Sequence, residues 1–100
     1  MVYDAEQFVW NATLEGDLDI YHAAKMLERI QAAVKEHPAK INFDCSKLAY
    51  VDSMGLGALI KVNTLVKEEG GIRLYHMSPR IYKLFVLTKL DTLFEVEVIE

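Results

Sequence analysis

The residues best suited to chemistry stand between Tyr50 and Ile60, in the run Tyr-Val-Asp-Ser-Met-Gly-Leu-Gly-Ala-Leu-Ile. The run follows an apolar, extended segment and leads into an amphipathic helical pattern, so Asp52 and Ser53 fall where a strand passes into a helix. Ser53 is a candidate N-cap, because a serine hydroxyl can accept a hydrogen bond from a free backbone N–H group there. A hydroxyl at such a junction faces solvent, where a partner can bind it or an enzyme can modify it.

Two glycines, Gly55 and Gly57, follow within the first turn of the expected helix. Each costs about 1 kcal/mol relative to alanine in a helix interior, so a helix cap alone does not explain them. They are explained if another surface approaches the backbone closely, or if helix and sheet pack tightly at this point.

The elements that must position this junction alternate between strand and helix. Expected strands cover residues 2–4, 7–14, 40–44, 72–75 and 94–99, with a turn at 15–19. Expected helices run from Ile20 to His37-Pro38, over 55–68 up to Gly70-Gly71, and onward from Ser78-Pro79. The predicted inner faces are Phe8, Trp10, Ala12 and Leu14; Ala24, Leu27, Ile30 and Val34; Leu56, Leu59, Ile60, Asn63 and Val66; and Ile81, Leu84, Phe85 and Thr88.

This order predicts an α/β fold, with a mixed β-sheet and helices packed against it, in one domain over residues 1–100. Strand–helix–strand connections of this length favour parallel neighbours and right-handed crossovers. In open sheets of this kind, loops at the carboxyl ends of strands usually carry the site. Asp52 and Ser53 lie on such a loop.

Composition excludes several classes of protein. The 100 residues carry a net charge of −4 and have no Lys/Arg-rich run, which argues against direct nucleic-acid binding. Cys45 is the sole cysteine, so no intrachain disulfide can form, and it is expected to be a small buried hydrophobic residue. No apolar run approaches the roughly 18 residues of a membrane span, and the acidic start lacks a signal-peptide core. We expect a cytoplasmic protein.

Enzyme hypotheses fail on the same residues. The segment around Ser53 partly matches the G-x-S-x-G nucleophile elbow, but Val51 stands where the first glycine is needed. Neither His22, His37 nor His76 is tied to Ser53 by its spacing, as the base of a serine hydrolase must be. A phosphate-binding loop would need a lysine and a longer spacing, and neither a metal-ligand cluster nor a cofactor motif is present. We expect no catalytic turnover, no metal and no cofactor.

Three stretches resemble one protein family. The octapeptide from Asp52 to Leu59 is similar to the D-S-x-G-L-G-x-L signature of the STAS-domain anti-sigma factor antagonists of bacteria. Leu14 to Asp19 resembles the family's G-x-L-D loop, and the stretch from Ile72 to Leu87 resembles its S-P-x-x-x-x-L-F segment. The matches occur in the right order and cover nearly the whole chain.

The resemblance implies a small STAS-type domain and a binding module rather than an enzyme. In this family the serine at the position of Ser53 is phosphorylated by a partner anti-sigma factor that is itself an ATP-dependent serine kinase. The unphosphorylated form binds that kinase and releases the sigma factor, and a serine phosphatase restores it. The expected contact residues are Asp19, Asp52, Ser53, Met54, Gly55, Leu56 and Gly57.

One departure from the family pattern is Met54, where a small residue is frequent. A STAS interaction or ligand-binding module without phosphorylation, in a larger signalling or transport assembly, is the alternative function. The hydroxyl of Ser53 favours the switch.

Overall fold

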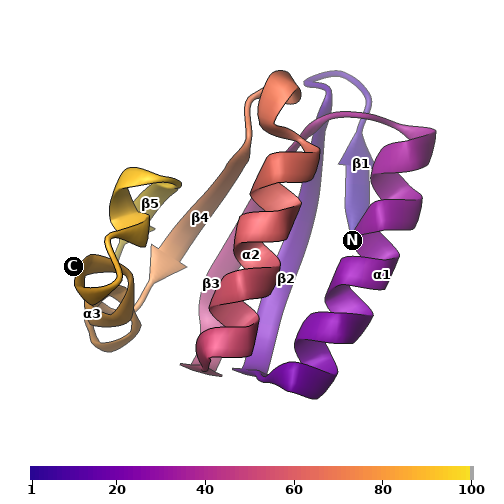
Figure 1. Cartoon of the computed structure of the whole chain (residues 1–100). Helices are drawn as coiled ribbons and strands as arrows, with labels where there is room; N and C mark the ends of the chain where they lie inside the picture. The colour runs from indigo at the N-terminus through magenta and orange to yellow at the C-terminus, as the bar shows by residue number, and fades with distance from the viewer. Residues whose placement is uncertain (100) are drawn as a thin grey trace.

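The computed structural model describes residues 1–99, in which a single five-stranded sheet is packed against helices (Figure 1). The alternation of strand and helix predicted from the sequence is confirmed. The strands are β1 (Val2–Asp4), β2 (Val9–Leu18), β3 (Lys40–Val51), β4 (Ile72–Met77) and β5 (Glu95–Val98), and the helices are α1 (Ile20–Glu36), α2 (Ser53–Leu65) and α3 (Pro79–Leu87), with short 3-10 helices η1 (Lys67–Glu69) and η2 (Leu90–Thr92).

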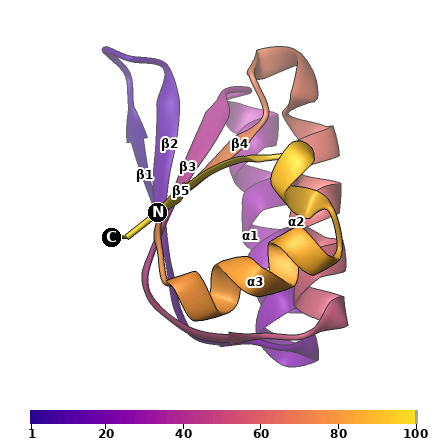
Figure 2. The same ribbon diagram turned by 90° about the vertical axis from the view of Figure 1, so that its left-hand side faces the viewer.

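The strands lie in the sheet in their chain order, β1-β2-β3-β4-β5. β1 is antiparallel to β2, and the other neighbours are parallel, so the predicted mixed sheet is confirmed. Right-handed crossovers between successive parallel neighbours place every helix on the same side of the sheet. Figure 2 shows the three α-helices on that side and the other face of the sheet uncovered.

β3 is longer than the segment 40–44 expected from the sequence, and the expectation was wrong because two bulges interrupt the alternation of this strand. Between Thr13 and Glu15 of β2, and again between Gly16 and Asp17, the facing stretch of β3 contains one extra residue. Its buried residues therefore stop recurring at every second position after Cys45.

β2 also continues farther than expected. Residues 15–18, assigned to a turn, are paired with β3 as far as Leu18. The strand begins at Val9, so Phe8 does not share the inner face with Trp10: it precedes the strand with a φ of 56° and is exposed. The longer strands carry both strand-to-helix junctions to the same end of the sheet.

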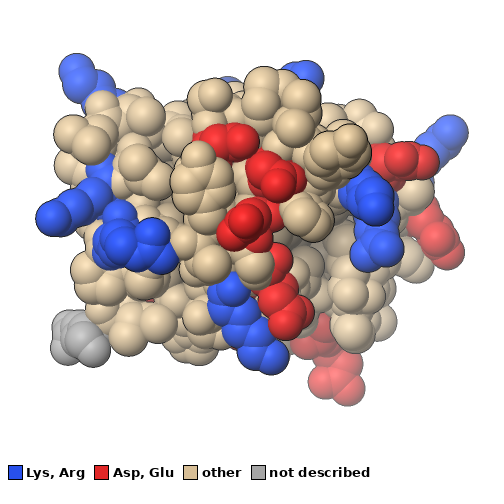
Figure 3. All heavy atoms as spheres, turned by 90° about the horizontal axis from the view of Figure 1, so that it is seen from below, with Lys and Arg blue, Asp and Glu red and all other residues tan. Residues whose placement is uncertain are grey.

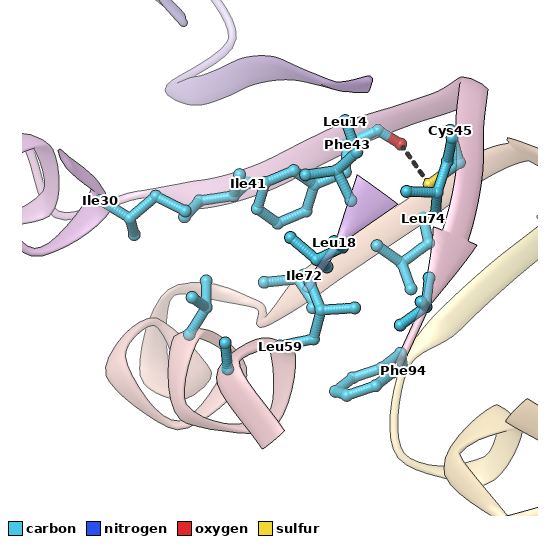
Figure 4. Packing of buried hydrophobic residues seen from close by; sticks show 14 of the residues in the cluster. Leu14, Leu18, Ile30, Ile41, Phe43, Cys45, Leu59, Ile72, Leu74 and Phe94 are labelled. Carbon is cyan, nitrogen blue, oxygen red and sulfur yellow. Dashed lines mark hydrogen bonds between the residues drawn. The ribbon is translucent and has the colours of Figure 1, made fainter. Parts of the chain in front are cut away.

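The core lies between the sheet and the helices. Figure 4 shows Leu14, Phe43 and Leu74 from three neighbouring strands with Leu59 of α2, all buried. Cys45 is buried too, as expected, and its thiol lies 3.8 Å from the carbonyl oxygen of Phe43. Burial raises the pKa of the Cys45 thiol to about 12, with a smaller effect from the neighbouring Asp44 carboxylate, so the group is inert at neutral pH.

Three residues predicted to lie on the inner faces of helices do not face the core. Ala24 of α1, Ile60 of α2 and Thr88, which caps the end of α3, are exposed, whereas Ala23 and Val62 are buried. Apolar residues occupy most positions of α2, so their period does not identify a single inner face.

Asn63 is the polar residue of the predicted inner face of α2, and a hydrogen bond to the backbone accounts for its place there. Its Oδ1 accepts a hydrogen bond of 3.0 Å from the backbone N–H of Ile72, at the start of β4. Gly71 lies between the two elements with a φ of 77°. The side chain thus joins the end of α2 to the next strand.

In residues 1–99, no helix is long and apolar enough to cross a membrane.

We expect Asn63→Ala to lower the free energy of unfolding by about 1–3 kcal/mol, because it leaves the N–H of Ile72 without a partner in a largely buried place. Thr64→Ala is the matched control on the exposed side of the same helix and should change stability by less than about 0.5 kcal/mol. Urea denaturation of both variants measures the difference. Equal losses would contradict this role of Asn63.

Candidate functional site

The candidate site is built where β2 and β3 end side by side. Leu18 is paired with Val51, the last residue of each strand, so the next residues, Asp19 and Asp52, occupy equivalent places. The backbone N–H of Asp52 donates to the carbonyl oxygen of Leu18 at 3.4 Å, which joins the two junctions directly. The helices α1 and α2 therefore begin beside each other at one end of the sheet (Figure 1).

Both helices begin with the same cap. The Asp19 carboxylate accepts a hydrogen bond of 3.0 Å from the N–H of His22, and the Asp52 carboxylate accepts one of 2.9 Å from the N–H of Gly55. Each bond satisfies one backbone donor that the first turn of a helix leaves free. The sequence drew attention to Asp52 but not to this role.

Ser53 is not the N-cap of α2, and this expectation was wrong because Asp52 takes that role. Serine and aspartate are about equally good caps, so the sequence alone does not distinguish them. Ser53 instead is the first residue of the helix, and it is exposed. Within residues 1–99 its hydroxyl makes no hydrogen bond, so the group is accessible to a second molecule.

The two glycines have different roles. A Cβ on Gly55 would overlap the carbonyl oxygen of Leu18, so only glycine allows α2 to start against the end of β2. A Cβ on Gly57 would meet nothing within 4 Å, and this residue borders open space. Close packing of helix and sheet, foreseen for the pair, explains Gly55 alone.

The open space is a groove between α1 and α2, with a volume of about 390 Å³. Ser53 and Met54 lie at its α2 side, and Met54 is exposed. Its walls are mostly apolar. The lining residues are Ile20, Ala23, Ala24 and Leu27 of α1 and Ser53, Met54, Gly57, Ala58 and Lys61 of α2.

The groove brings together some of the expected contact residues and adds others. Ser53, Met54 and Gly57 line it, with Asp19 and Asp52 at the adjoining helix starts. Gly55 is buried and Leu56 is packed against the core, so neither lines the groove.

Sequence reasoning missed the contribution of α1 and of Lys61. Ile20, Ala24 and Leu27 line the groove, although the last two had been assigned to the core. The sequence contained a signal, because α1 has more apolar residues than a single buried stripe needs. The structure leaves one of them, Ile20, 57% exposed.

Negative charge gathers at this end of the molecule. Viewed from the end where α1 and α2 begin, Asp and Glu side chains form a band down the middle of the surface, with Lys or Arg beside its lower part and toward both sides (Figure 3). The pKa of the Asp19 carboxyl lies below its ordinary value, mainly because the N–H of His22 donates to it. The His22 ring also lies 2.8 Å from this carboxylate. Asp19 thus stays ionised well into the acid range.

Comparison with known families identifies the fold. The sequence profile of the family described as "Mlab, STAS domain" matches residues 9–97. The chain belongs to the STAS-domain family, and the resemblance noted in the sequence is confirmed.

Its similar relatives include bacterial regulators. The chain is 29% identical over 84 residues to the anti-sigma-B factor antagonist of Bacillus subtilis, covering 83% of this chain and 76% of that protein. It is 27% identical over 86 residues to the protein of the same name from Listeria monocytogenes, covering 85% and 75%.

Two solved structures share the fold. The anti-sigma factor antagonist SpoIIAA in its unphosphorylated form superposes with a TM-score of 0.65 at 21% identity, covering 88% of this chain and 76% of that one. A sulfate transporter family protein from Wolinella succinogenes superposes with a TM-score of 0.76 at 17% identity, covering 97% and 80%. The STAS-type α/β fold predicted from the sequence is therefore confirmed.

We expect Gly55→Ala and Gly57→Ala to change stability in opposite directions. The methyl group at Gly55 meets the backbone of Leu18, so the free energy of unfolding should fall by about 1–3 kcal/mol or more. At Gly57 the methyl group meets open space, and the better helix propensity of alanine should add up to about 1 kcal/mol. Urea denaturation of the two variants decides; equal effects would contradict the assigned roles.

Proposed function

We propose that this protein is an anti-sigma factor antagonist that binds an anti-sigma factor serine kinase, and that phosphorylation of Ser53 prevents this binding. The observation that carries the proposal is the free hydroxyl of Ser53. Asp52 caps the helix in its place, so the hydroxyl has no structural task and stands exposed at the first position of α2. The relatives named anti-sigma-B factor antagonist support the partner class.

The groove beside Ser53 gives such a partner a surface to bind. Its apolar walls can receive one or two apolar side chains, and the exposed Met54 adds a flexible contact at its edge. Burying these groups supplies affinity, while Asp19 and Asp52 at the helix starts fix the charge that the partner must match. Ser53 lies within this contact surface, so a modification there acts on binding directly.

Phosphorylation changes the charge of this surface more than the stability of the fold. It adds about −1.5 to −2 charges at neutral pH. The helix start tolerates a phosphate, because the helix dipole and free N–H groups favour an anion by up to about 1 kcal/mol at an exposed site. The same charge adds to those of the Asp19 and Asp52 carboxylates at the helix starts and repels a partner that accommodates those carboxylates. A serine phosphatase then restores the binding form.

A second candidate function is a STAS module that binds its partner constitutively in a transport or signalling assembly. The superposition with the sulfate transporter family protein favours it. In that case the groove would still bind a partner, but Ser53 would accept no phosphate. Incubation with an anti-sigma factor kinase and ATP distinguishes the two functions.

We expect Ser53→Ala to abolish phosphate incorporation by an anti-sigma factor kinase that labels the wild-type protein, while binding to the kinase is retained. The hydroxyl is the acceptor, and its loss removes no intramolecular hydrogen bond within residues 1–99. Ser46→Ala is the matched control, since Ser46 is an exposed serine on β3. Mass spectrometry locates the phosphate. Full labelling of the Ser53→Ala protein would sink the proposal.

We expect Ser53→Asp to melt within a few degrees of wild type, because a carboxylate in the first turn of a helix is favoured by the dipole. Its affinity for the kinase should fall at least about tenfold, or roughly 1.4 kcal/mol. Ser53→Asn has nearly the same shape without the charge and should lose much less. The loss of affinity caused by Ser53→Asp should be smaller at high salt, because salt screens exposed charges.

Circular dichroism melts and titration calorimetry on the same preparations measure both quantities. A large fall in melting temperature together with weak binding would show that the fold, and not the surface charge, had changed. Equal losses for the Asp and Asn variants would point to shape instead of charge.

A further inference from the structure

A second surface lies on the edge of the sheet, away from the groove. β1 pairs with β2 only from Val9 to Asn11, although β2 runs to Leu18. In Figure 1, β1 accompanies only the upper part of β2, and the lower part has no strand on that side. From Thr13 onward, β2 thus presents an unpaired strand edge, whose free N–H and C=O groups can pair with another extended segment.

A cleft of about 310 Å³ follows this edge, between β2 and α1. Its apolar floor includes Leu14 and Leu18 of β2, Met26 and Ile30 of α1, and Phe43 of β3. The floor lies on the helix side of the sheet, which buried residues of β2 face, while exposed residues alternate with them. An extended segment laid along the edge would therefore direct every second side chain into the cleft.

The helix side and the outer side of this strand edge carry opposite charges. His22, Lys25 and Arg29 lie on one stripe of α1, at spacings of three and four residues. Glu15 and Asp17 stand on β2 at exposed positions. Within residues 1–99, Lys25, Arg29, Glu15 and Asp17 belong to no ion pair, so their charges face solvent and are available to another molecule.

We propose that this edge binds an extended segment of a partner protein, which adds to the sheet as a strand beside residues 13–18. Its side chains that enter the cleft are apolar or acidic, to match the floor and the cations of α1. Its alternate side chains are basic, to match Glu15 and Asp17 on the outer side. Strand addition of this kind takes affinity from backbone hydrogen bonds and specificity from alternate side chains.

Other occupants fit the cleft less well. A second copy of this chain paired edge to edge would bring Glu15 and Asp17 near the same carboxylates, and like charges on facing strands repel. A fatty carboxylate could use the apolar floor and the cations of α1. It would leave the N–H and C=O groups of the strand edge without partners.

The test is a titration of the 15N-labelled protein, residues 1–100, with the capped hexapeptide Lys-Leu-Lys-Glu-Lys-Leu. We expect amide signals of residues 13–18 and of the facing side of α1 to shift. A peptide with proline in place of the central lysine cannot pair as a strand and should not bind. No shift at about 1 mM peptide, or shifts confined to α2 and Ser53, would overturn the proposal. Shifts with dodecanoate and none with the peptide would overturn it too, and would assign the cleft to a lipid.

Charge variants test the expected orientation. The double variant E15K/D17K should weaken binding about fivefold or more, because it places like charges opposite the lysines of the peptide. The double variant K25E/R29E should weaken binding of this peptide. Its affinity for a peptide with leucine in place of glutamate should stay close to that of the wild-type protein. All four residues are exposed, so the fold should be retained. Equal affinity of both variants and the wild-type protein would contradict the proposed strand.

Discussion

The contact between Gly55 and the carbonyl oxygen of Leu18 is the constraint on which the rest of the site depends. It holds the first turn of α2 against the end of β2, while the pairing of Leu18 with Val51 holds β2 beside β3. Because both contacts involve backbone, substitutions of the side chains that line the groove leave the helix start in place. The groove, the two aspartate caps and the exposed serine all follow from this alignment.

In the proposed switch, one residue stabilises the helix start and another responds to a partner. Asp52 satisfies the free backbone donor, and Ser53 beside it contributes only a hydroxyl to the surface. If a single serine did both, its modification would remove the cap and disturb the first turn. With two adjacent residues, the surface can change while the helix keeps its hydrogen bond.

The sequence was sufficient for the order of the elements, the STAS fold and the position of the Asp52–Ser53 junction between a strand and a helix. It failed where several residues were equally suited to one role. Asp52 and Ser53 are both good caps, and only the position of the Gly55 N–H distinguishes them. The end of β3 was missed because bulges break its period of two. The end of β2 was missed because Glu15, Gly16 and Asp17 are typical of a turn. The groove was missed because an alanine at helical spacing, such as Ala24, fits a core and a contact surface equally well.

The bulges of β3 also determine how the domain responds to changes in chain length. Leu18 lies five positions after Thr13 in β2, whereas its partner Val51 lies seven positions after Asp44, the partner of Thr13, in β3. A deletion of one residue at each bulge would therefore leave a regular strand, still ending opposite Leu18. Such deletions would reduce the local twist of β3. They leave the start of α2, and with it Ser53, at the same place on the molecule.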